Sequence, residues 1–301
     1  MRHSTSLAIV GIFLVTMTGC SSLGQVRFSA IGDTPYYASD SELERLSETF
    51  DLMSTHGIPF VVHVGDIFRS WTPCSAELYK IRAAIFTKTP MPFLITLGDN
   101  EFNDCVDANK AQALFREIIL GNPSTQQVVT GTNSAFAPIQ VNRQKDMIEN
   151  ATWSVNNVDF IMLTLPDLPG NYPLGTDRIN KILSANLTFM LDGFSNAIRN
   201  NRQSIVLIMH SDPTLCQVSG CNNFNNQLIE QVKKFKKPVL LINGSNHARE
   251  FLDGGYQALS NWSRLRPGNE PEELWPEITF STINNRFVIK WHPGPSATLD
   301  K

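Results

Sequence analysis

Three short apolar runs in the first third of the chain each end in Gly-Asp. They are Val26–Asp33, Val61–Asp66 and Phe93–Asp99, and their aspartates stand 33 residues apart. Two histidines, His210 and His247, follow later apolar runs. Crowded carboxylates repel one another unless a cation lies between them, so carboxylates and imidazoles brought together predict a divalent metal site. Oxygen donors mixed with imidazole favour Mn, Fe or Zn over Ca, in one or two positions.

Buried parallel strands must position these side chains. Each Gly-Asp run has the length and composition of a strand covered on both faces of a sheet. The interval between runs suits one strand, helix, strand unit, and right-handed crossovers would bring the three carboxylates to one sheet edge. That edge is where open α/β sheets build their sites. We therefore predict that Asp33, Asp66, Asp99, His210 and His247 converge there.

The rest of the chain alternates helical and strand patterns. A sandwich of two mixed sheets flanked by helices, of the α/β class, fits this many strands better than one sheet. Helices are predicted over 39–55, 77–87, 108–120, 177–199 and 223–235, a hairpin over 151–165, and strands over 204–209, 239–242, 256–258, 277–282 and 286–291. The Asn-, Ser- and Gln-rich segment 121–145 is predicted to be an irregular excursion.

Composition places the chain among folded globular proteins. Hydrophobic residues make up 42% and charged residues 18%, and the formal net charge is −3. This balance gives no electrostatic reason to expect a nucleic-acid partner. We expect residues 20–301 to form a single domain.

The first residues have the order of an export signal. Arg2 and His3 precede the apolar run 7–15, and Thr18-Gly19-Cys20 follows it. We predict a signal peptide over 1–19 and lipidation at Cys20, because the sequence resembles the lipobox of bacterial lipoproteins. The membrane would then be contacted only through this anchor, at the bacterial cell envelope, on the outer membrane facing the periplasm. A cleaved signal without lipid and an uncleaved anchor are the alternatives.

Four cysteines remain after Cys20, an even number that suits disulfides in an oxidising compartment. Cys74 and Cys105 each follow a Gly-Asp strand closely, so we pair them. Cys216 and Cys221 would close a small loop after His210. Other pairings and thiolate metal ligation are the alternatives, although no Cys-x-x-Cys spacing is present.

The order of the motifs resembles a known family. Gly-Asp, Gly-Asp, Gly-Asp-Asn-Glu, His and Gly-Ser-Asn-His stand in sequence across residues 26–292. This order is similar to that of the calcineurin-like metallophosphoesterases, whose pattern is Asp-x-His, Gly-Asp, Gly-Asn-His-Asp/Glu, His, Gly-His-x-His. The segment from Gly98 to Cys105 also resembles the motif of an exported bacterial subgroup, which has Gly-Asp-Asn-Glu-Trp and a nearby cysteine.

The resemblance implies a four-layer αββα fold and a two-metal site that hydrolyses the phosphate monoester or diester of a small substrate. Asp33 and His247 would hold the first metal, His210 the second, and Asp66 would bridge them. Asp99 stands at the position of the family's asparagine ligand and would act in catalysis.

Three positions depart from the family pattern. Pro35 and Ser245 replace histidine ligands, and Asn100 replaces the histidine that assists the transition state. Asn100 is then the catalytic candidate at that position, able to donate a hydrogen bond but no proton.

Three further polar residues could support the ligands. Asp104 and Asp212 are predicted to orient a ligand histidine or to cap a loop. His63 lies within an apolar strand, where it either supports the site or is a core histidine with its hydrogen bonds satisfied.

Two classes of function follow. The first is a metal-dependent phosphoesterase with water as the nucleophile. The second is a catalytically weak or inactive descendant that binds a ligand or partner at the cell envelope. The missing histidines favour the second class, and retention of the five metal-ligand candidates favours the first.

Overall fold

Two β-sheets form the centre of the protein. The computed structural model describes residues 25–37, 39–216, 218 and 220–298. The smaller sheet has five strands in the order β13-β12-β1-β2-β3. Their bounds are β1 Gln25–Ile31, β2 Val61–His63, β3 Phe93–Ile95, β12 Leu274–Ser281 and β13 Arg286–Pro293. Strands β1, β2 and β3 are parallel neighbours, which confirms the predicted adjacency of the Gly-Asp strands.

The larger sheet has eight strands in the order β10-β11-β9-β8-β7-β6-β5-β4. Its central strands β7, β8, β9 and β11 are parallel to one another, and the remaining pairs are antiparallel. The bounds are β4 Gln126–Val129, β5 Ile139–Arg143, β6 Ala151–Val155, β7 Val158–Met162, β8 Ser204–Ile208, β9 Val239–Ile242, β10 Arg249–Leu252 and β11 Trp262–Pro267.

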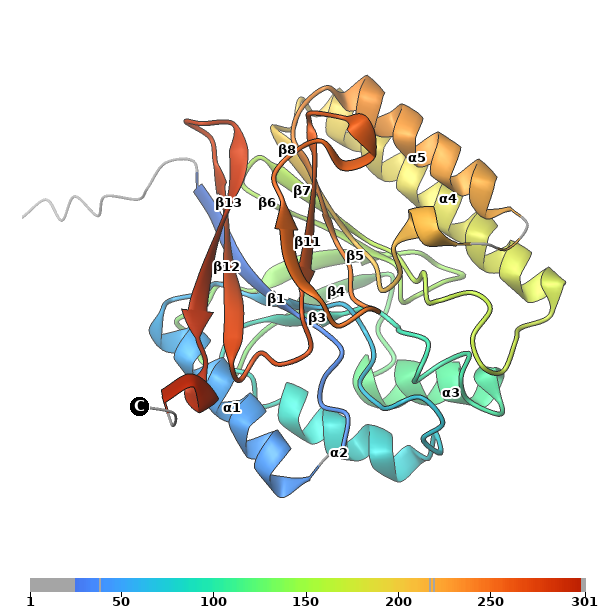
Figure 1. Cartoon of the computed structure of the whole chain (residues 1–301), viewed down its shortest axis with the longest axis vertical. Helices are drawn as coiled ribbons and strands as arrows, with labels where there is room; N and C mark the ends of the chain where they lie inside the picture. Colours follow the sequence, from blue (N-terminus) through green and yellow to red (C-terminus); the bar gives the residue numbers. More distant parts are fainter. Residues whose placement is uncertain (1–24, 38, 217, 219, 299–301) are drawn as a thin grey trace, which may run out of the picture.

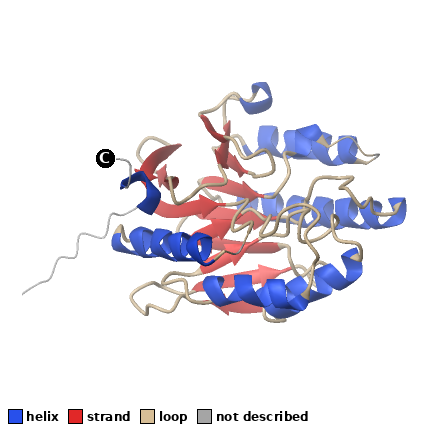
Figure 2. Cartoon of the chain, turned by 60° about the horizontal axis from the view of Figure 1, so that its bottom comes forward, coloured by secondary structure: helices blue, strands red, loops and turns tan. Residues whose placement is uncertain are grey.

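Helices cover both outer faces of this sandwich, as Figures 1 and 2 show. Helices α1, α2 and α3 pack on the five-stranded sheet, and α4 and α5 pack on the eight-stranded sheet. The predicted four-layer αββα architecture is therefore confirmed. The bounds are α1 Asp40–Thr55, α2 Ala76–Phe86, α3 Ala108–Leu114, α4 Thr176–Arg199 and α5 Cys221–Phe235, with short helical turns η1 Phe115–Ile119, η2 Pro213–Leu215, η3 Tyr256–Ala258 and η4 Pro295–Thr298.

An aromatic cluster holds the two sheets together. Phe28 and Phe60 stack with ring centroids 5.3 Å apart, and Phe160 of the opposite sheet meets Phe28 edge-on at 5.2 Å. Trp153 stacks on Phe160 at 5.0 Å. All four are at most 2% exposed. Such ring pairs stabilise beyond the area they bury, so this cluster fixes how the strand ends of one sheet face those of the other.

Four strands, one turn and one helix differ from the sequence-based prediction. Segment 121–145 is not wholly irregular, because it contains the antiparallel pair β4 and β5 at the sheet edge. Outward Gln and Asn side chains on these strands give the segment the composition of a loop. Residues 256–258 form a 3-10 turn rather than a strand, and the strands before and after this turn, β10 and β11, were not predicted. The helix predicted over 108–120 changes to π-helical geometry at Phe115.

Both predicted disulfides are formed. Cys74 is joined to Cys105 and Cys216 to Cys221, with Cα atoms 5.8 and 5.9 Å apart. The predicted signal peptide and Cys20 lie outside the described residues. Within the described part of the chain, none of the helices combines the length and the apolar character that crossing a bilayer requires.

Candidate metal centre

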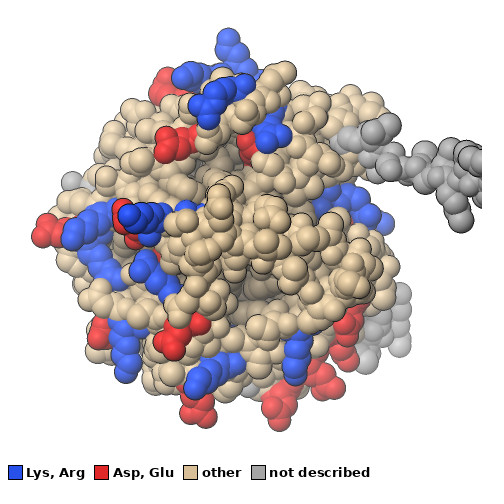
Figure 3. All heavy atoms as spheres, turned by 180° about the vertical axis from the view of Figure 1, so that it is seen from behind, with Lys and Arg blue, Asp and Glu red and all other residues tan. Residues whose placement is uncertain are grey.

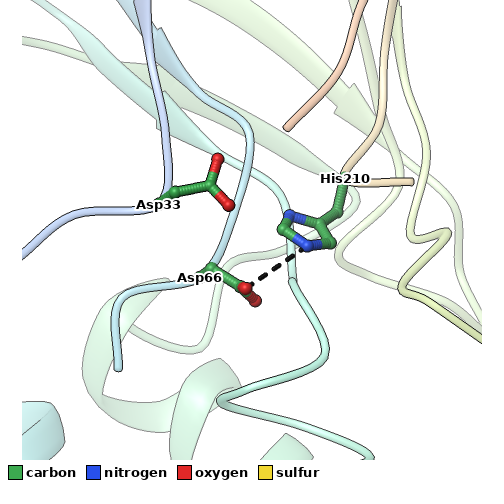
Figure 4. Close-up of side chains that lie close together, drawn as sticks. All are labelled: Asp33, Asp66 and His210. Atoms are coloured by element: carbon green, nitrogen blue, oxygen red, sulfur yellow. Dashed lines mark ion pairs between the residues drawn. The ribbon is translucent and has the colours of Figure 1, made fainter. Parts of the chain in front are cut away.

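The predicted ligands from both sheets converge at one edge of the sandwich. Asp33, Asp66 and Asp99 follow the ends of β1, β2 and β3, and His210 follows β8. One ligand atom each from Asp33, Asp66 and His210 lie within 4.8 Å of one another, as Figure 4 shows. All three residues are buried. Separate strand ends therefore meet as the sequence pattern predicted.

His210 is held by its backbone partner and faces two carboxylates. Its Nδ1 lies 2.9 Å from the carbonyl oxygen of Val64, to which it donates. Its Nε2 lies 2.9 Å from Oδ1 of Asp99 and 3.4 Å from Oδ2 of Asp66. A histidine that donates one ring N–H to a backbone carbonyl presents the other nitrogen in a fixed direction, which is the usual arrangement of a metal ligand.

His247 completes the edge on the side of Asp33. Its Nε2 lies 3.7 Å from Oδ1 of Asp33, and its side chain is 47% exposed. The hydroxyl of Tyr36 lies 2.7 Å from the same Nε2 and donates to Oδ1 of Asp33 at 3.4 Å. His247 is thus the accessible member of the set, and Tyr36 links it to the first Gly-Asp loop.

Local backbone geometry explains why these loops carry Gly-Asp. Asp33 and Asp66 have φ angles of 55° and 61°, in the left-handed region. This region costs a non-glycine residue roughly 1–2 kcal/mol, and such strain concentrates at functional sites. A Cβ atom at Gly98 would overlap the Asp66 carboxylate, and one at Gly244 would overlap Oδ2 of Asp33. Both glycines therefore allow backbone to approach the carboxylates closely.

The electrostatics of the cluster favour a bound cation. Burial raises the pKa of Asp33, and it raises the pKa of Asp66 further still. Burial alone would lower the pKa of His210, but the carboxylates of Asp66 and Asp99 raise it well above its ordinary value. For Asp99 burial is outweighed by hydrogen bonding and charge from His210, which lower its pKa. A protonated His210 partly neutralises the carboxylates, and a divalent cation would do so more fully.

Glu101 is a functional residue that the sequence reasoning missed. Its buried carboxylate accepts the backbone N–H groups of Gly98 at 2.7 Å, Ile67 at 3.1 Å and Asp66 at 3.2 Å. It thereby fixes the second Gly-Asp loop against the third. The sequence did contain a signal for this role. Glu101 stands three residues after Gly98, and at that spacing a carboxylate can accept the backbone N–H at the start of its own turn.

Asp167 and Ser245 were not recognised as partners. Ser245 occupies a family histidine position, and its Oγ donates to Oδ2 of Asp167 at 2.6 Å. Its backbone N–H donates to Oδ1 of Asp33 at 3.1 Å. Ser245 therefore orients Asp33 instead of ligating a metal through an imidazole. Nothing in the spacing of the sequence indicated that the loop containing Asp167 reaches this edge.

Two residues predicted to act in the site, Asn100 and His63, have different roles in the structure. The Asn100 amide donates to the carbonyl of Phe68 at 2.8 Å, while its backbone N–H donates to Oδ1 of Asp66 at 3.1 Å. Asn100 thus positions Asp66 through its backbone, and its side-chain nitrogen is already engaged. His63 is a core histidine with both ring nitrogens bonded, to the carbonyl of Thr34 at 2.8 Å and the N–H of Gly65 at 3.0 Å.

The two predicted supporting aspartates cap loops. Asp212 accepts from Thr214 and Tyr256 and pairs with Arg264 at 2.8 Å. Asp104 accepts from Ser70 and Asn171. Among the described hydrogen bonds, neither aspartate contacts His210 or His247. Of the two roles predicted for them, loop capping is the one observed.

The donor set fits a divalent metal. Among the described residues Oδ2 of Asp33 is buried without a hydrogen-bond partner, and Nε2 of His210 meets only the carboxylates of Asp99 and Asp66. Buried polar atoms are almost always satisfied, so the orphaned carboxylate oxygen calls for a ligand. Three carboxylates and two imidazoles match the preferences of Mn, Fe or Zn.

Comparison with known proteins supports the fold. No family model and no curated protein matches the sequence. Among solved structures, a dimetal phosphatase from Danio rerio is similar over 89% of this chain and 96% of its own, with a TM-score of 0.58 and 10% identity. A purple acid phosphatase from yellow lupin seeds is similar over 91% of this chain, with a TM-score of 0.52 and 12% identity. The chain spans about half of the lupin enzyme, 52% of its length.

At such low identities the likeness establishes the fold alone. That fold is the metallophosphoesterase sandwich which the motif order predicted.

Proposed function

We propose that this chain, which has the metallophosphoesterase fold, is a divalent-metal-dependent hydrolase of small phosphate esters. The observation that carries the proposal is the convergence of Asp33, Asp66, Asp99, His210 and His247 at one edge, with Oδ2 of Asp33 buried and without a partner among the described residues. A protein that only bound a partner would gain nothing from burying carboxylates this close together, because desolvation without a cation is unfavourable.

Each metal ion would be held by ligands from both sheets. Asp33 and His247 would hold one ion, Asp99 and His210 the other, and Asp66 would lie between them. Divalent ions bound there would ionise a water near neutral pH and neutralise charge on the phosphoryl oxygens. Asp66 is oriented for this by the backbone N–H of Asn100, and His210 by the carbonyl of Val64.

Tyr36 is the residue that we assign to the role of the missing histidines. Burial raises the pKa of its hydroxyl far above the ordinary value, and nearby carboxylates raise it further, so the hydroxyl stays protonated. It lies beside His247 and Asp33, from where it can donate a hydrogen bond to a phosphoryl oxygen or leaving group. A donor aimed at developing charge is worth on the order of 100-fold in rate.

The proposed substrate is small. The formal net charge is −3, and on the face shown in Figure 3 basic and acidic side chains are interspersed around an uncharged centre. Such a surface offers no extended basic patch on that face for a polyanion.

The test pairs elemental analysis with turnover of p-nitrophenyl phosphate and its bis-ester in Mn, Fe and Zn. We expect one or two ions per chain, metal-dependent turnover, and loss of both in Asp66→Ala. Asp159→Ala is the matched control, because this strand aspartate pairs with Arg202 at 2.9 Å and belongs to no metal-ligand candidate set. Unchanged metal content and turnover in Asp66→Ala, with a normal melting temperature, would reject the site.

We also propose that the protein is lipidated on Cys20 at the bacterial envelope, after removal of residues 1–19. The two disulfides support export, because they persist in oxidising compartments. Mass spectrometry of the N-terminal peptide from the membrane fraction should show acylated Cys20, and Cys20→Ala should move the protein to the soluble fraction. An unmodified N-terminus in membranes would contradict this assignment.

A further inference from the structure

Two exposed aromatic rings form a corner between two loops that also carry residues of the candidate metal centre. Trp71 is 61% exposed and Tyr172 is 37% exposed, and their rings meet edge to face with centroids 5.1 Å apart. Trp71 belongs to the loop that begins with Asp66, and Tyr172 to the loop that contains Asp167. Large apolar side chains gathered on a surface mark binding sites more often than chance exposure does.

The corner is held in place by polar contacts and a disulfide. The carboxylate of Asp104 accepts from Ser70 Oγ at 2.8 Å and from the backbone and side chain of Asn171 at 2.7 and 2.8 Å. The disulfide between Cys74 and Cys105 joins the loop of Trp71 to the loop of Asp104 covalently. Trp71 has a φ angle of 67°, in the left-handed region that side chains other than glycine rarely adopt. The surrounding contacts therefore impose the position of Trp71 on a backbone that would otherwise avoid it.

A cavity of about 420 Å³ opens against these rings. This volume lies in the range of small-molecule sites. Val106 and the Cys74–Cys105 disulfide also line it. Asp104 and Asp107 line it together with Lys110, so among the described residues its charged lining is more acidic than basic. The cavity therefore offers aromatic and apolar surface without an excess of positive charge.

We propose that this corner binds the flat ring of the substrate's leaving group, a nucleobase or an aryl ring, stacked on Trp71 with its edge toward Tyr172. A flat ring can stack on one aromatic face while the second ring meets its edge, which is the geometry that aromatic pairs prefer. That the ring belongs to the leaving group rests on the proposed function. The five residues from Asp66 to Trp71 span at most about 18 Å when extended, and the bond from Thr72 N–H to the Arg69 carbonyl shortens this path.

The binding test uses metal-free protein, so that it does not depend on catalysis. Adenosine, adenosine 5′-monophosphate, phenyl phosphate, glycerol phosphate and methyl glucoside are titrated by calorimetry. Stacking of a base on an aromatic side chain is worth about 1–3 kcal/mol. We therefore expect Trp71→Ala to weaken adenosine binding by roughly 5- to 150-fold, Trp71→Phe to weaken it less, and glycerol phosphate binding not to change. Ile283→Ala, at an 87% exposed position in the β12–β13 turn, is the surface control.

Intrinsic fluorescence gives a second measurement. Trp153, Trp262 and Trp275 are buried, whereas Trp71 is exposed, so saturable quenching by adenosine should disappear in Trp71→Phe. No saturable adenosine binding, binding of methyl glucoside alone, or binding unaffected by Trp71→Ala would each overturn the proposal.

Kinetics separate this proposal from the proposed function. With metal present, we expect Trp71→Ala to raise KM for p-nitrophenyl phosphate and adenosine monophosphate about 10-fold while kcat/KM for glycerol phosphate stays unchanged. A protein that binds adenosine through Trp71 but hydrolyses no ester would refute the phosphoesterase assignment and the leaving-group assignment, leaving only the ring site. A protein that hydrolyses esters with equal loss, or no loss, for ring and non-ring substrates in Trp71→Ala would refute the ring site alone.

Discussion

The two sheets supply chemically different halves of the candidate metal centre. The five-stranded sheet contributes the carboxylates of Asp33, Asp66 and Asp99, and the eight-stranded sheet contributes the imidazoles of His210 and His247. Hydrogen bonds join the halves, among them the bonds from His210 to the Val64 carbonyl and from Ser245 N–H to Asp33. The carboxylate half alone is a cluster of repelling charges, and the imidazole half alone offers two donors. The complete set of metal ligands therefore forms only when the two sheets pack together with their strand ends aligned.

The largest predicted effect comes from loosening that packing. Phe160→Ala removes the ring that contacts Phe28 and Phe60 across the sandwich and Trp153 on the neighbouring strand. We expect the free energy of unfolding to fall by about 3–5 kcal/mol, measured by urea denaturation. Ile283→Ala at the exposed turn should change it by less than about 0.5 kcal/mol. Equal effects of the two substitutions would show that the aromatic cluster does not hold the sheets together.

The next prediction contrasts the two histidines of the imidazole half. His210 is fully buried and lies against two carboxylates, whereas His247 is 47% exposed and lies 3.7 Å from one. We expect His210→Ala to lower metal-dependent kcat/KM on the order of 1,000-fold and His247→Ala about 10-fold. Turnover with saturating metal, alongside metal content, measures this. A larger loss in His247→Ala would reverse the ranking.

The two disulfides are expected to differ in how much each contributes to the free energy of unfolding. Cys74–Cys105 closes 31 residues beside the carboxylate loops, and Cys216–Cys221 closes 5 residues beyond His210. Loop-closure entropy predicts a loss of about 4 kcal/mol when the first is replaced by serines and about 2 kcal/mol for the second. Urea denaturation of the two double variants tests the difference. Equal losses would mean that the chain-entropy account does not apply here.

The smallest effect at neutral pH concerns His63. Burial lowers the pKa of His63 from 6.5 to about 3. Between these values the unfolded chain binds a proton that the folded chain does not, so the contribution of His63 to stability is present above pH 6.5 and is lost as the pH falls toward 3. We expect the wild type to lose more stability over this range than His63→Gln. Parallel pH profiles would contradict the assignment.

The carboxylate half was easier to predict from the sequence than the imidazole half. Each Gly-Asp strand is a mainly apolar run with an abrupt end, and Ser39 provides the N-cap that begins α1. Strands at the two edges of the eight-stranded sheet carry more polar residues or charges, so β4, β5 and β10 have the composition of loops. A strand of this kind is stabilised by neighbours that are distant in the sequence.

The candidate metal ligands could be predicted from the sequence. The residues that hold these ligands in place through hydrogen bonds could not. Asp66 and His210 stand at strand ends, where the side-chain type and position are both visible in the sequence. Glu101, Asp167 and Ser245 act through hydrogen bonds to loops that only the folded chain brings near. The side-chain amide of Asn100 is bound to Phe68, which its place in the motif did not indicate.

The most direct test of a metal centre shared between the sheets is anomalous diffraction from crystals grown with Mn or Zn. We predict an anomalous peak within bonding distance of both the Asp66 carboxylate and Nε2 of His210, which come from opposite sheets. Peaks confined to the protein surface, or none at saturating metal, would contradict the account.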